Sequence, residues 1–376
     1  MDKVGTSGAE EKADCRVEAD LTPSKLGIDI ETKVEKLYGK TIRKNVRKKL
    51  EEFGIDRGSI KIRDKGAYDF VIAARVEAAL LKAGAEIESD FVDPSGERET
   101  NLRRTRLYLP GNNPKLLFYG TLFDCDCVIL DLEDSVIEDS KMDARVLVRN
   151  MLHNLNYKQE RMVRINPLPL GEEDIKEILK TDIDTLLIPK VETREELENV
   201  IAIIDEYESG YEKDTCIGVI PIIETALGLE NAFEIALHER VTAMTFGAED
   251  YLADVGGQRN KESLFYLRSR VLNAAKACGI QALDTVFPDI NDEEGLEKEA
   301  RMIRAMGFDG KGIIHPRQAD VIHKVFTPSD DEYKRAKKIV DAFKKSEGEA
   351  VSVDGRMVDL PVAKRAQKTV SLYEGS

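Results

Sequence analysis

The feature that most restricts the fold of this chain is a regular alternation of apolar and amphipathic segments after about residue 101. Eight short apolar runs occur there, and charged stretches with helical periodicity separate them. The runs are 107–109, 127–130, 162–165, 185–188, 217–223, 241–246, 281–286 and 312–314. A repeated strand and helix order of this kind is typical of a parallel sheet. Eight units in about 220 residues favour a closed (β/α)8 TIM barrel over an open doubly wound sheet, so the predicted fold class is α/β.

The region in front of these runs predicts a small α+β domain. Apolar residues recur every three or four positions from Ile30 to Phe53, which predicts one long amphipathic helix. An alternating run at 59–63 and an alanine-rich helical stretch ending near Gly84 follow it. Residues 1 to about 27 have few periodic apolar positions and predict a structure-poor lead. The predicted division is 1–87 for this domain, 88–101 for a linker, 102–328 for the barrel and 329–376 for a C-terminal arm.

The overall composition argues against several classes of partner and compartment. The chain has 71 acidic and 56 basic residues and a net charge of −15, which argues against nucleic acid or an anionic membrane as the main partner. No apolar stretch approaches the roughly 18 residues of a membrane span. The five cysteines lack CxxC spacing, so neither a disulfide framework nor a zinc site is predicted. We expect a cytoplasmic protein.

Polar side chains follow most of the predicted strands, on the face where barrel enzymes hold their catalytic groups. They are Asp131, Glu133, Asp134, Arg164, Asn166, Lys190, Glu224, Glu249, Asp250, Asp284 and His315. So many carboxylates repel one another unless a cation lies among them, and Mg²⁺ prefers oxygen ligands. We therefore expect Glu224 and Asp250 to hold a divalent metal. Arg164 is expected to bind a substrate carboxylate through two hydrogen bonds.

Two of these residues also suggest other chemistry. A lysine at the end of a barrel strand, here Lys190, can form a Schiff base with a carbonyl substrate. An ion pair with the acidic rim is favoured, because neighbouring carboxylates raise the pKa of a lysine and a Schiff base needs it lowered. His315 is a candidate acid or base, but a histidine beside a proline is more often packed or hydrogen-bonded in a loop.

Seven short motifs occur in one order between about residues 103 and 370. They are 103–112 (RRTRLYLPGN), 130–134 (LDLED), 163–166 (VRIN), 221–225 (PIIET), 247–251 (GAEDY), 309–311 (DGK) and 357–362 (MVDLPV). Together they closely resemble the β subunit of citrate lyase and its relatives. These relatives are Mg²⁺-dependent acyl-thioester lyases and include malyl- and citramalyl-CoA lyases.

The resemblance implies a role for five residues. Mg²⁺ is implied at Glu224 and Asp250, and Arg104 and Arg164 match arginines that bind the carboxylate of the 2-oxo acid. Arg164 is thereby also a catalytic candidate. Asp359 matches an aspartate that acts as an acid or base in a neighbouring subunit's site, which implies a homo-oligomer, a trimer or a hexamer.

The implied reaction is carbon–carbon cleavage of a citryl or related 3-hydroxy-dicarboxylyl thioester. It yields oxaloacetate or another 2-oxo acid and an acetyl-type thioester, with Mg²⁺ as the Lewis acid. Three alternatives remain at this point. They are a malyl- or citramalyl-CoA lyase, a thioesterase on the same scaffold, and a non-catalytic component that recruits other citrate lyase subunits.

Residues 28–84 resemble a second protein, the acyl carrier subunit of citrate lyase. The matching segments are 29–31 (DIE), 34–36 (VEK), 38–39 (YG), 64–67 (DKGA) and 74–78 (ARVEA). In that family a phosphopantetheine-type arm is attached to a serine in a Gly-Thr-Leu-Glu-Ser-Ser-Asp segment. Lys12 and Ala13 stand at the serine positions here, and Ser7 is the only serine before Ser24. The resemblance thus leaves open whether the substrate is a thioester of CoA or of a carrier arm.

Overall fold

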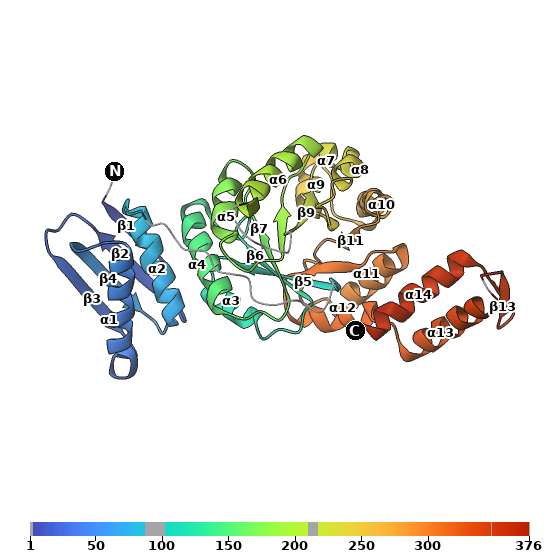
Figure 1. The fold of residues 1–376 in the computed structure, drawn as a ribbon, viewed down its shortest axis with the longest axis horizontal. Helices are drawn as coiled ribbons and strands as arrows, with labels where there is room; N and C mark the ends of the chain where they lie inside the picture. The colour runs from blue at the N-terminus through green and yellow to red at the C-terminus, as the bar shows by residue number, and fades with distance from the viewer. Residues whose placement is uncertain (1–2, 87–101, 210–216, 347, 376) are drawn as a thin grey trace.

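The computed structural model describes residues 3–86, 102–209, 217–346 and 348–375. The predicted linker 88–101 and Cys216 lie outside these ranges. Figure 1 shows an N-terminal domain in blue at one end, a barrel from teal to orange in the middle, and a C-terminal arm in red at the other end. None of the helices in the described ranges combines the length and the apolar composition that a bilayer crossing needs.

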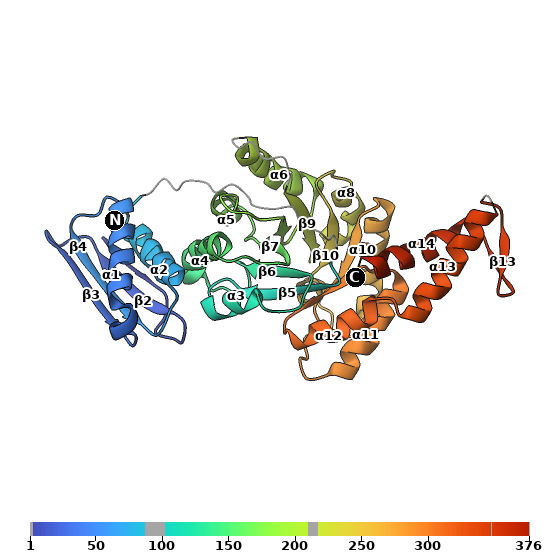
Figure 2. The same cartoon turned by 60° about the horizontal axis from the view of Figure 1, so that its bottom comes forward.

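A four-stranded sheet and two helices form the N-terminal domain. They are β1 (Val4–Ser7), β2 (Cys15–Asp20), β3 (Leu26–Thr32), α1 (Glu35–Glu52), β4 (Gly58–Asp64) and α2 (Asp69–Lys82). The strand order is β1-β2-β4-β3, and β3 runs parallel to β4 whereas the other neighbours are antiparallel. Both helices lie on one face of the sheet (Figure 2), where apolar side chains from sheet and helices form a common core.

The predicted structure-poor lead is wrong, because β1 and β2 occupy much of it. Cys15, Val17 and Ala19 point into the core and alternate with more exposed residues, as expected for a strand with one buried face. Two of these three apolar residues are small, so the signal with a period of two is weak. The long helix begins at Glu35 rather than Ile30, because the preceding residues form β3.

Eight parallel strands close into a barrel, which confirms the predicted fold class. They are β5 (Thr105–Pro110), β6 (Cys127–Asp131), β7 (Glu160–Arg164), β8 (Thr185–Ile188), β9 (Gly218–Ile223), β10 (Ala243–Phe246), β11 (Gln281–Asp284) and β12 (Gly310–Ile313). Each strand pairs with its sequence neighbours, and β12 pairs with β5 to close the ring. These strands overlap all eight of the apolar runs.

Helices surround the barrel and connect its strands (Figure 1). They are α3 (Pro114–Gly120), α4 (Lys141–Asn154), α5 (Leu170–Ile178), α6 (Arg194–Ser209), α7 (Ala226–Glu230), α8 (Ala232–Ala236), α9 (Ala248–Asp254), α10 (Lys261–Ala277), α11 (Glu293–Met306) and α12 (Arg317–Phe326), with a 3₁₀ turn η1 (Glu138–Ser140). The largest apolar core lies between the strands and these helices. A smaller core fills the barrel interior, so the catalytic face is left as the place for a cavity.

The N-terminal domain packs directly against the barrel through helix α2. Val71, Ala74 and Ala78 of α2 are at most 1 % exposed and belong to the apolar core of the barrel. The ring of Tyr68 stacks on that of Phe118 in α3, with their centroids 4.6 Å apart. This face of α2 therefore contributes to the packing of two domains.

Ion pairs between α2 and α4 extend this contact. Glu77, which is 2 % exposed, pairs with Arg149. Lys82, the last residue of α2, lies 2.7 Å from the carboxylate of Asp143. Buried and partly buried pairs of this kind fix the relative position of two helices, because either charge is costly if left alone.

Two helices and a short hairpin form the C-terminal arm. They are α13 (Asp330–Lys345), β13 (Val351–Val353), β14 (Arg356–Val358) and α14 (Leu360–Glu374). The helices pack on each other through a small apolar cluster of their own. The hairpin lies at the tip of the arm, far from the N-terminal domain in both views (Figures 1 and 2).

Candidate active site

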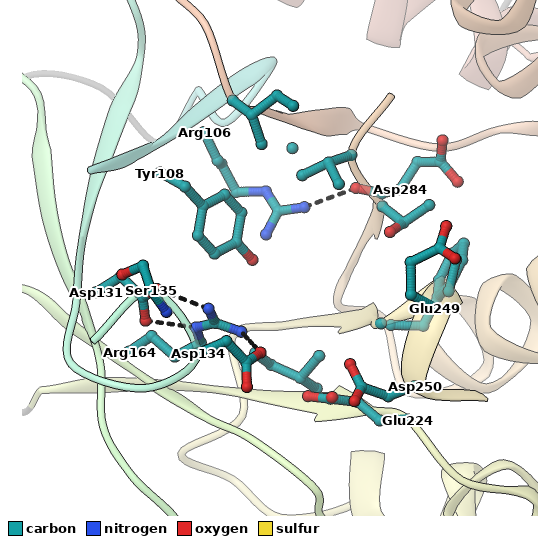
Figure 3. Close-up of a pocket in the computed structure, with 18 of the residues that line it drawn as sticks. Arg106, Tyr108, Asp131, Asp134, Ser135, Arg164, Glu224, Glu249, Asp250 and Asp284 are labelled. Atoms are coloured by element: carbon teal, nitrogen blue, oxygen red, sulfur yellow. Dashed lines mark hydrogen bonds and ion pairs between the residues drawn. The ribbon is translucent and has the colours of Figure 1, made fainter. Parts of the chain in front are cut away.

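A cavity of about 470 Å³ lies at the carboxyl ends of the barrel strands. Figure 3 shows its polar side chains, which come from several different strands and the loops that follow them. The ionisable lining residues are Arg106, Tyr108, Asp131, Asp134, Arg164, Glu224, Glu249, Asp250 and Asp284. Most of the carboxylates predicted at strand ends are thus brought together.

Two carboxyl groups, those of Glu224 and Asp250, lie side by side on one wall of the cavity (Figure 3). Glu224 directly follows β9, and Asp250 is in the first turn of α9 after β10. Glu224 is 1 % exposed, and neither of its carboxylate oxygens has a hydrogen-bond partner among the described residues. Burial, together with the charges of Glu133 and Asp250, raises the pKa of Glu224 to about 8.

This pair of carboxyl groups fits a divalent cation. A buried carboxylate without a donor is costly unless an ion compensates its charge. No group of three or more acidic, histidine or cysteine side chains in the described ranges is arranged around a possible metal position. Two protein carboxylates are nevertheless typical of Mg²⁺, which fills the rest of its octahedron with water and substrate oxygens.

A glycine next to this pair makes room for it. A Cβ atom on Gly247 would lie 2.9 Å from Cγ and 3.0 Å from Oε2 of Glu224. Distances this short do not occur between a real Cβ and its neighbours, so any side chain at this position displaces the carboxylate of Glu224. The loop from β10 to α9 therefore sets the position of both carboxyl groups.

Arg164 lines the cavity as predicted, but acidic side chains at the end of β6 and in the loop after it already hold it. Its Nε and Nη2 atoms each lie 2.7 Å from an oxygen of Asp131. Its Nη1 atom lies 2.8 Å from Glu133 and 3.0 Å from Asp134. Burial alone would raise the pKa of Asp131, yet the hydrogen bonds from Arg164 hold that pKa below its ordinary value.

Arg104, the other predicted carboxylate ligand, does not line this cavity. It precedes β5 and therefore lies at the amino ends of the strands, on the opposite face of the barrel. Its Nε and Nη2 atoms bind Asp126 at 2.9 and 2.8 Å, and Nη1 donates to Thr327 at 2.7 Å. Arg104 was predicted to bind the substrate carboxylate because the resemblance matches it to an arginine at the first strand. It lies at the amino end of that strand, however, and not at the carboxyl end, where the cavity is.

Arg106, which the sequence reasoning passed over, lies in the cavity instead (Figure 3). Arg106 is in β5, two residues nearer the catalytic face than Arg104, and is fully buried. A sequence signal was present, because Arg106 and Tyr108 are two residues apart and so point to the same side of a strand. The motif 103–112 contains three arginines, and the resemblance directed attention to the second.

The side chains considered for other chemistry make structural contacts. The ammonium group of Lys190 lies 3.0 Å from Glu133, and this contact raises the pKa of Lys190, which confirms the predicted ion pair. The ring of His315 accepts a hydrogen bond from the backbone N–H of Arg317 at 3.2 Å, as predicted for a loop histidine. The carboxylate of Asp284 is bound to Arg268 and Lys311.

Asp359 does not line the cavity of its own chain. It caps α14 in the C-terminal arm, where its side chain accepts a hydrogen bond from the backbone N–H of Val362 at 3.2 Å. It stands beside two exposed apolar side chains, Met357 at 72 % and Leu360 at 53 % exposure. In one copy of the chain, Asp359 and the pair of Glu224 and Asp250 are therefore in separate parts of the molecule.

Two protein families match this chain. The family described as HpcH/HpaI aldolase/citrate lyase matches residues 104–316. The family described as malonate decarboxylase delta subunit matches residues 2–83. The first match covers the barrel and its cavity, and the second covers nearly all of the N-terminal domain.

Individual relatives agree with these matches. Citrate lyase subunit beta of Leuconostoc mesenteroides subsp. cremoris is 39% identical over 281 residues, which are 72% of this chain and 93% of that protein. Mitochondrial citramalyl-CoA lyase of Homo sapiens is 34% identical over 319 residues, 78% of this chain and 94% of that protein. The crystal structure of protein CitE from Mycobacterium tuberculosis in complex with magnesium, acetoacetate and coenzyme A has a TM-score of 0.61 and 33% identity, and the match covers 73% of this chain and 99% of that chain.

Proposed function

Because the chain belongs to the HpcH/HpaI aldolase/citrate lyase family, we propose that it is a Mg²⁺-dependent lyase that cleaves a citryl or related 3-hydroxy-dicarboxylyl thioester. The predicted family and its carbon–carbon lyase class are confirmed by the relatives. The products are oxaloacetate or another 2-oxo acid and an acetyl-type thioester. The observation that carries the proposal is the buried carboxylate of Glu224, which lies beside Asp250 on the catalytic face without a hydrogen-bond donor among the described residues.

Glu224 and Asp250 are the residues that would hold Mg²⁺. When bound, Mg²⁺ supplies Lewis-acid stabilisation of the negative charge that develops on substrate oxygens. The chain's own residues prepare the site for an anionic substrate. Asp131 holds Arg164 in the cavity, where its guanidinium lies 5.3 Å from the ring centre of Tyr108 and offsets part of the acidic wall. Apolar lining such as Ile222 and Phe246 limits water, which strengthens these electrostatic interactions.

Cleavage also needs a group that exchanges protons with the substrate hydroxyl and with the thioester carbon. We assign this role to Asp359 of a neighbouring copy, because the residue lies outside the cavity of its own chain. The exposed Met357 and Leu360 on either side of it support a tip that packs against another subunit. The proposed assembly is a homo-oligomer, a trimer or a hexamer, in which each arm completes a neighbour's site. Other citrate lyase subunits are further possible partners of this assembly.

The N-terminal domain is proposed to be an unloaded relative of a carrier, so that the substrate is a thioester of free CoA. Ser7 is 1 % exposed within β1 and is closed to a modifying enzyme. The exposed residues in the following turn are Glu10, Glu11 and Lys12, and none of them has a hydroxyl for attachment. The coenzyme A in the CitE structure supports a CoA-bound substrate here. Intact-mass spectrometry of protein from its native host tests this, and a phosphopantetheine-type mass addition would overturn it.

A cytoplasmic location is proposed together with this substrate. Cys15, Cys125, Cys127 and Cys278 all carry free thiols in the described part of the chain. Free thiols fit a reducing compartment, where disulfides are rare.

The proposed reaction is tested by its products. Citryl-CoA and Mg²⁺ are mixed with the protein, and oxaloacetate is measured through its NADH-dependent reduction by malate dehydrogenase. We expect oxaloacetate and acetyl-CoA in equal amounts, no turnover with EDTA, and no turnover for Asp250→Asn. The matched control is Glu230→Gln. Glu230 is an exposed carboxylate that follows the same strand as Glu224, so this variant should retain full activity.

The alternatives give different results in this assay. Release of free CoA with intact citrate indicates a thioesterase. Turnover of citramalyl- or malyl-CoA without turnover of citryl-CoA indicates a lyase with a different substrate. No turnover of any of the three thioesters overturns the proposed function in favour of an assembly component.

A further inference from the structure

Arg106 is a fully buried cation whose donors are only partly used. Its Nη2 atom donates to the Thr245 hydroxyl at 3.1 Å and to the Asp284 carbonyl oxygen at 2.8 Å. Its Nε and Nη1 atoms have no hydrogen-bond partner in the part of the chain that the structure describes. The same side chain lines the cavity that contains Glu224 and Asp250 (Figure 3). The residue that carries these unused donors thus borders a substrate-sized space.

The other cations around this cavity are already neutralised by carboxylates. Arg164 is held by Asp131, Glu133 and Asp134, and Lys190 by Glu133. Arg268 and Lys311 bind the carboxylate of Asp284, the residue whose backbone carbonyl accepts a hydrogen bond from Arg106. Arg106 itself forms no ion pair with any described residue, because only the backbone carbonyl of Asp284 faces it.

A buried guanidinium without an anionic partner lowers the stability of the folded chain. Burial lowers the pKa of Arg106 from its ordinary value, since the charged form is poorly solvated there. An apolar side chain of similar length would fill the same space without this cost. A buried, uncompensated charge in a cavity is a marker of a ligand site rather than of stability. The chemistry that satisfies it is an anion, since a carboxylate oxygen can accept a hydrogen bond from a free N–H and also compensates the charge of the guanidinium.

We propose that Arg106 binds the second carboxylate of the substrate and thereby selects citryl-type thioesters over thioesters with a single carboxylate. The inference rests on the proposed lyase function and deepens it. Carbon 3 of a citryl thioester carries a hydroxyl, one carboxylate and one carboxymethyl group. In citramalyl and malyl thioesters the carboxymethyl group is replaced by a methyl group or a hydrogen. Arg106 is therefore a specificity residue for the 2-oxo acid half of the substrate.

The position of Arg106 in the cavity agrees with this assignment. Glu224 and Asp250 come from β9 and the helix after β10, whereas Arg106 comes from β5. A metal at the carboxyl pair leaves Arg106 free for a group at the other side of the cavity (Figure 3). Glu224 and Asp250 would hold the metal at one side of the cavity, and Arg106 would meet the second carboxylate of the substrate at the other.

The test compares Arg106→Met and Arg106→Lys with the wild-type protein on citryl-CoA and citramalyl-CoA. We expect Arg106→Met to lower kcat/KM for citryl-CoA by about 100-fold, because a buried charge-assisted contact is lost. The value for citramalyl-CoA should change by less than about 3-fold, because that substrate has no group for Arg106. Arg106→Lys should retain part of the citryl-CoA activity, since it keeps a charge but loses the planar fork.

A binding measurement separates this role from a general effect on folding. Oxaloacetate with Mg²⁺ should raise the melting temperature of the wild-type protein more than pyruvate does, and Arg106→Met should abolish that difference. Equal losses on both thioesters, or an unchanged preference of the variant for oxaloacetate, would overturn the inference. Wild-type turnover of citramalyl-CoA alone would also overturn it while leaving the lyase function intact. Failure to cleave any thioester would instead refute the proposed function.

Discussion

Buried charges are treated differently in the N-terminal domain and in the barrel cavity. In the N-terminal domain, Arg75 binds both oxygens of Asp14 at 2.9 and 2.8 Å, and both residues are nearly inaccessible. In the cavity, Glu224 and Arg106 are equally buried, yet Glu224 has no donor and Arg106 uses only one of its nitrogens within the described ranges. These ionisable side chains are therefore similarly buried in the two regions, but only those in the N-terminal domain have a partner of opposite charge in the described part of the chain.

The difference separates charges that serve folding from charges that serve a ligand. A paired buried charge is costly to disturb, because removal of one partner leaves the other uncompensated. An unpaired buried charge already bears that cost in the folded chain, so its removal should stabilise the protein and abolish a function. The two regions thus predict opposite effects of substitution on stability and on activity, and each prediction below tests one side of this contrast.

The largest expected effect is on activity in the cavity. Glu224→Gln should lower kcat by at least about 10³-fold, because the developing charge on the substrate loses its stabilisation by the metal. The melting temperature of the metal-free variant should be at or above that of the wild-type protein. Turnover is measured with citryl-CoA, and unfolding is followed by circular dichroism in EDTA.

A loss of stability in Glu224→Gln would contradict the contrast, since it would mean that the carboxylate has a structural partner. Gly247→Ala is a matched second variant, because a methyl group there displaces the Glu224 carboxylate without removing its charge. Like Glu224→Gln, Gly247→Ala should weaken the dependence of activity on Mg²⁺.

The second effect is on stability in the N-terminal domain. Arg75→Met should lower the free energy of unfolding by about 3–5 kcal/mol, because Asp14 is then buried without a partner. The kcat of the remaining folded protein should be unchanged. Chemical denaturation followed by circular dichroism gives the first quantity, and an activity assay corrected for folded fraction gives the second.

A double variant controls for the loss of the side chain itself. Arg75→Met combined with Asp14→Leu removes both charges, so it should recover most of the stability lost in the single variant. If the double variant is as unstable as the single one, packing of the Arg75 side chain, and not the ion pair, is what stabilises the domain.

The barrel was predictable from sequence because its signal is repeated. Eight buried strands give eight apolar runs, and errors in the bounds of one run do not change their number. The first two strands of the N-terminal domain gave no comparable signal, since β1 has four residues and β2 buries small side chains such as Cys15 and Ala19. The packing of α2 on α4 was also not predictable, because it depends on the surface of a second domain.

The candidate site was predictable where a residue directly follows a strand. Glu224 does so, Asp250 lies four residues after the end of β10, and the structure brings the two together. Arg104 lies just before β5 and Arg106 lies within it, and no pattern in the sequence fixes where the strand begins. The partners that hold Arg164 lie at the end of β6 and in the loop after it, and only the structure shows that Asp131 already binds this arginine.

The third prediction concerns how stability depends on pH. The folded-state pKa of Glu224 is raised to about 8, so between its ordinary value near 4.5 and pH 8 the folded protein keeps a proton that the unfolded chain has released. The metal-free protein should therefore lose stability as the pH rises through this window, on the order of 1.4 kcal/mol for each pH unit. Glu224→Gln should remove this loss, and Mg²⁺ should reverse it, because the metal binds the ionised carboxylate.

A paired carboxylate should show the opposite dependence. Although burial opposes it, hydrogen bonds from Arg104 and His323 hold the pKa of Asp126 well below its ordinary value. Its contribution is present above the ordinary pKa near 4 and is lost as the pH falls. Asp126→Asn should thus cost more stability at pH 7 than at pH 3. Thermal unfolding at pH 3, 6 and 8 measures both dependences, and the same sign for the two residues would contradict the contrast.

The smallest expected effect comes from an ion pair on the surface of the N-terminal sheet. Arg63 on β4 lies 2.9 Å from Glu31 on β3, a distance as short as those in the pair of Arg75 and Asp14. The side chains of Arg63 and Glu31 are 50% and 66% exposed, so water screens their attraction and also solvates either charge alone. Glu31→Gln should therefore change the free energy of unfolding by less than about 0.5 kcal/mol. A cost similar to that of Arg75→Met in the same denaturation experiment would mean that distance, and not burial, decides how much an ion pair contributes in this domain.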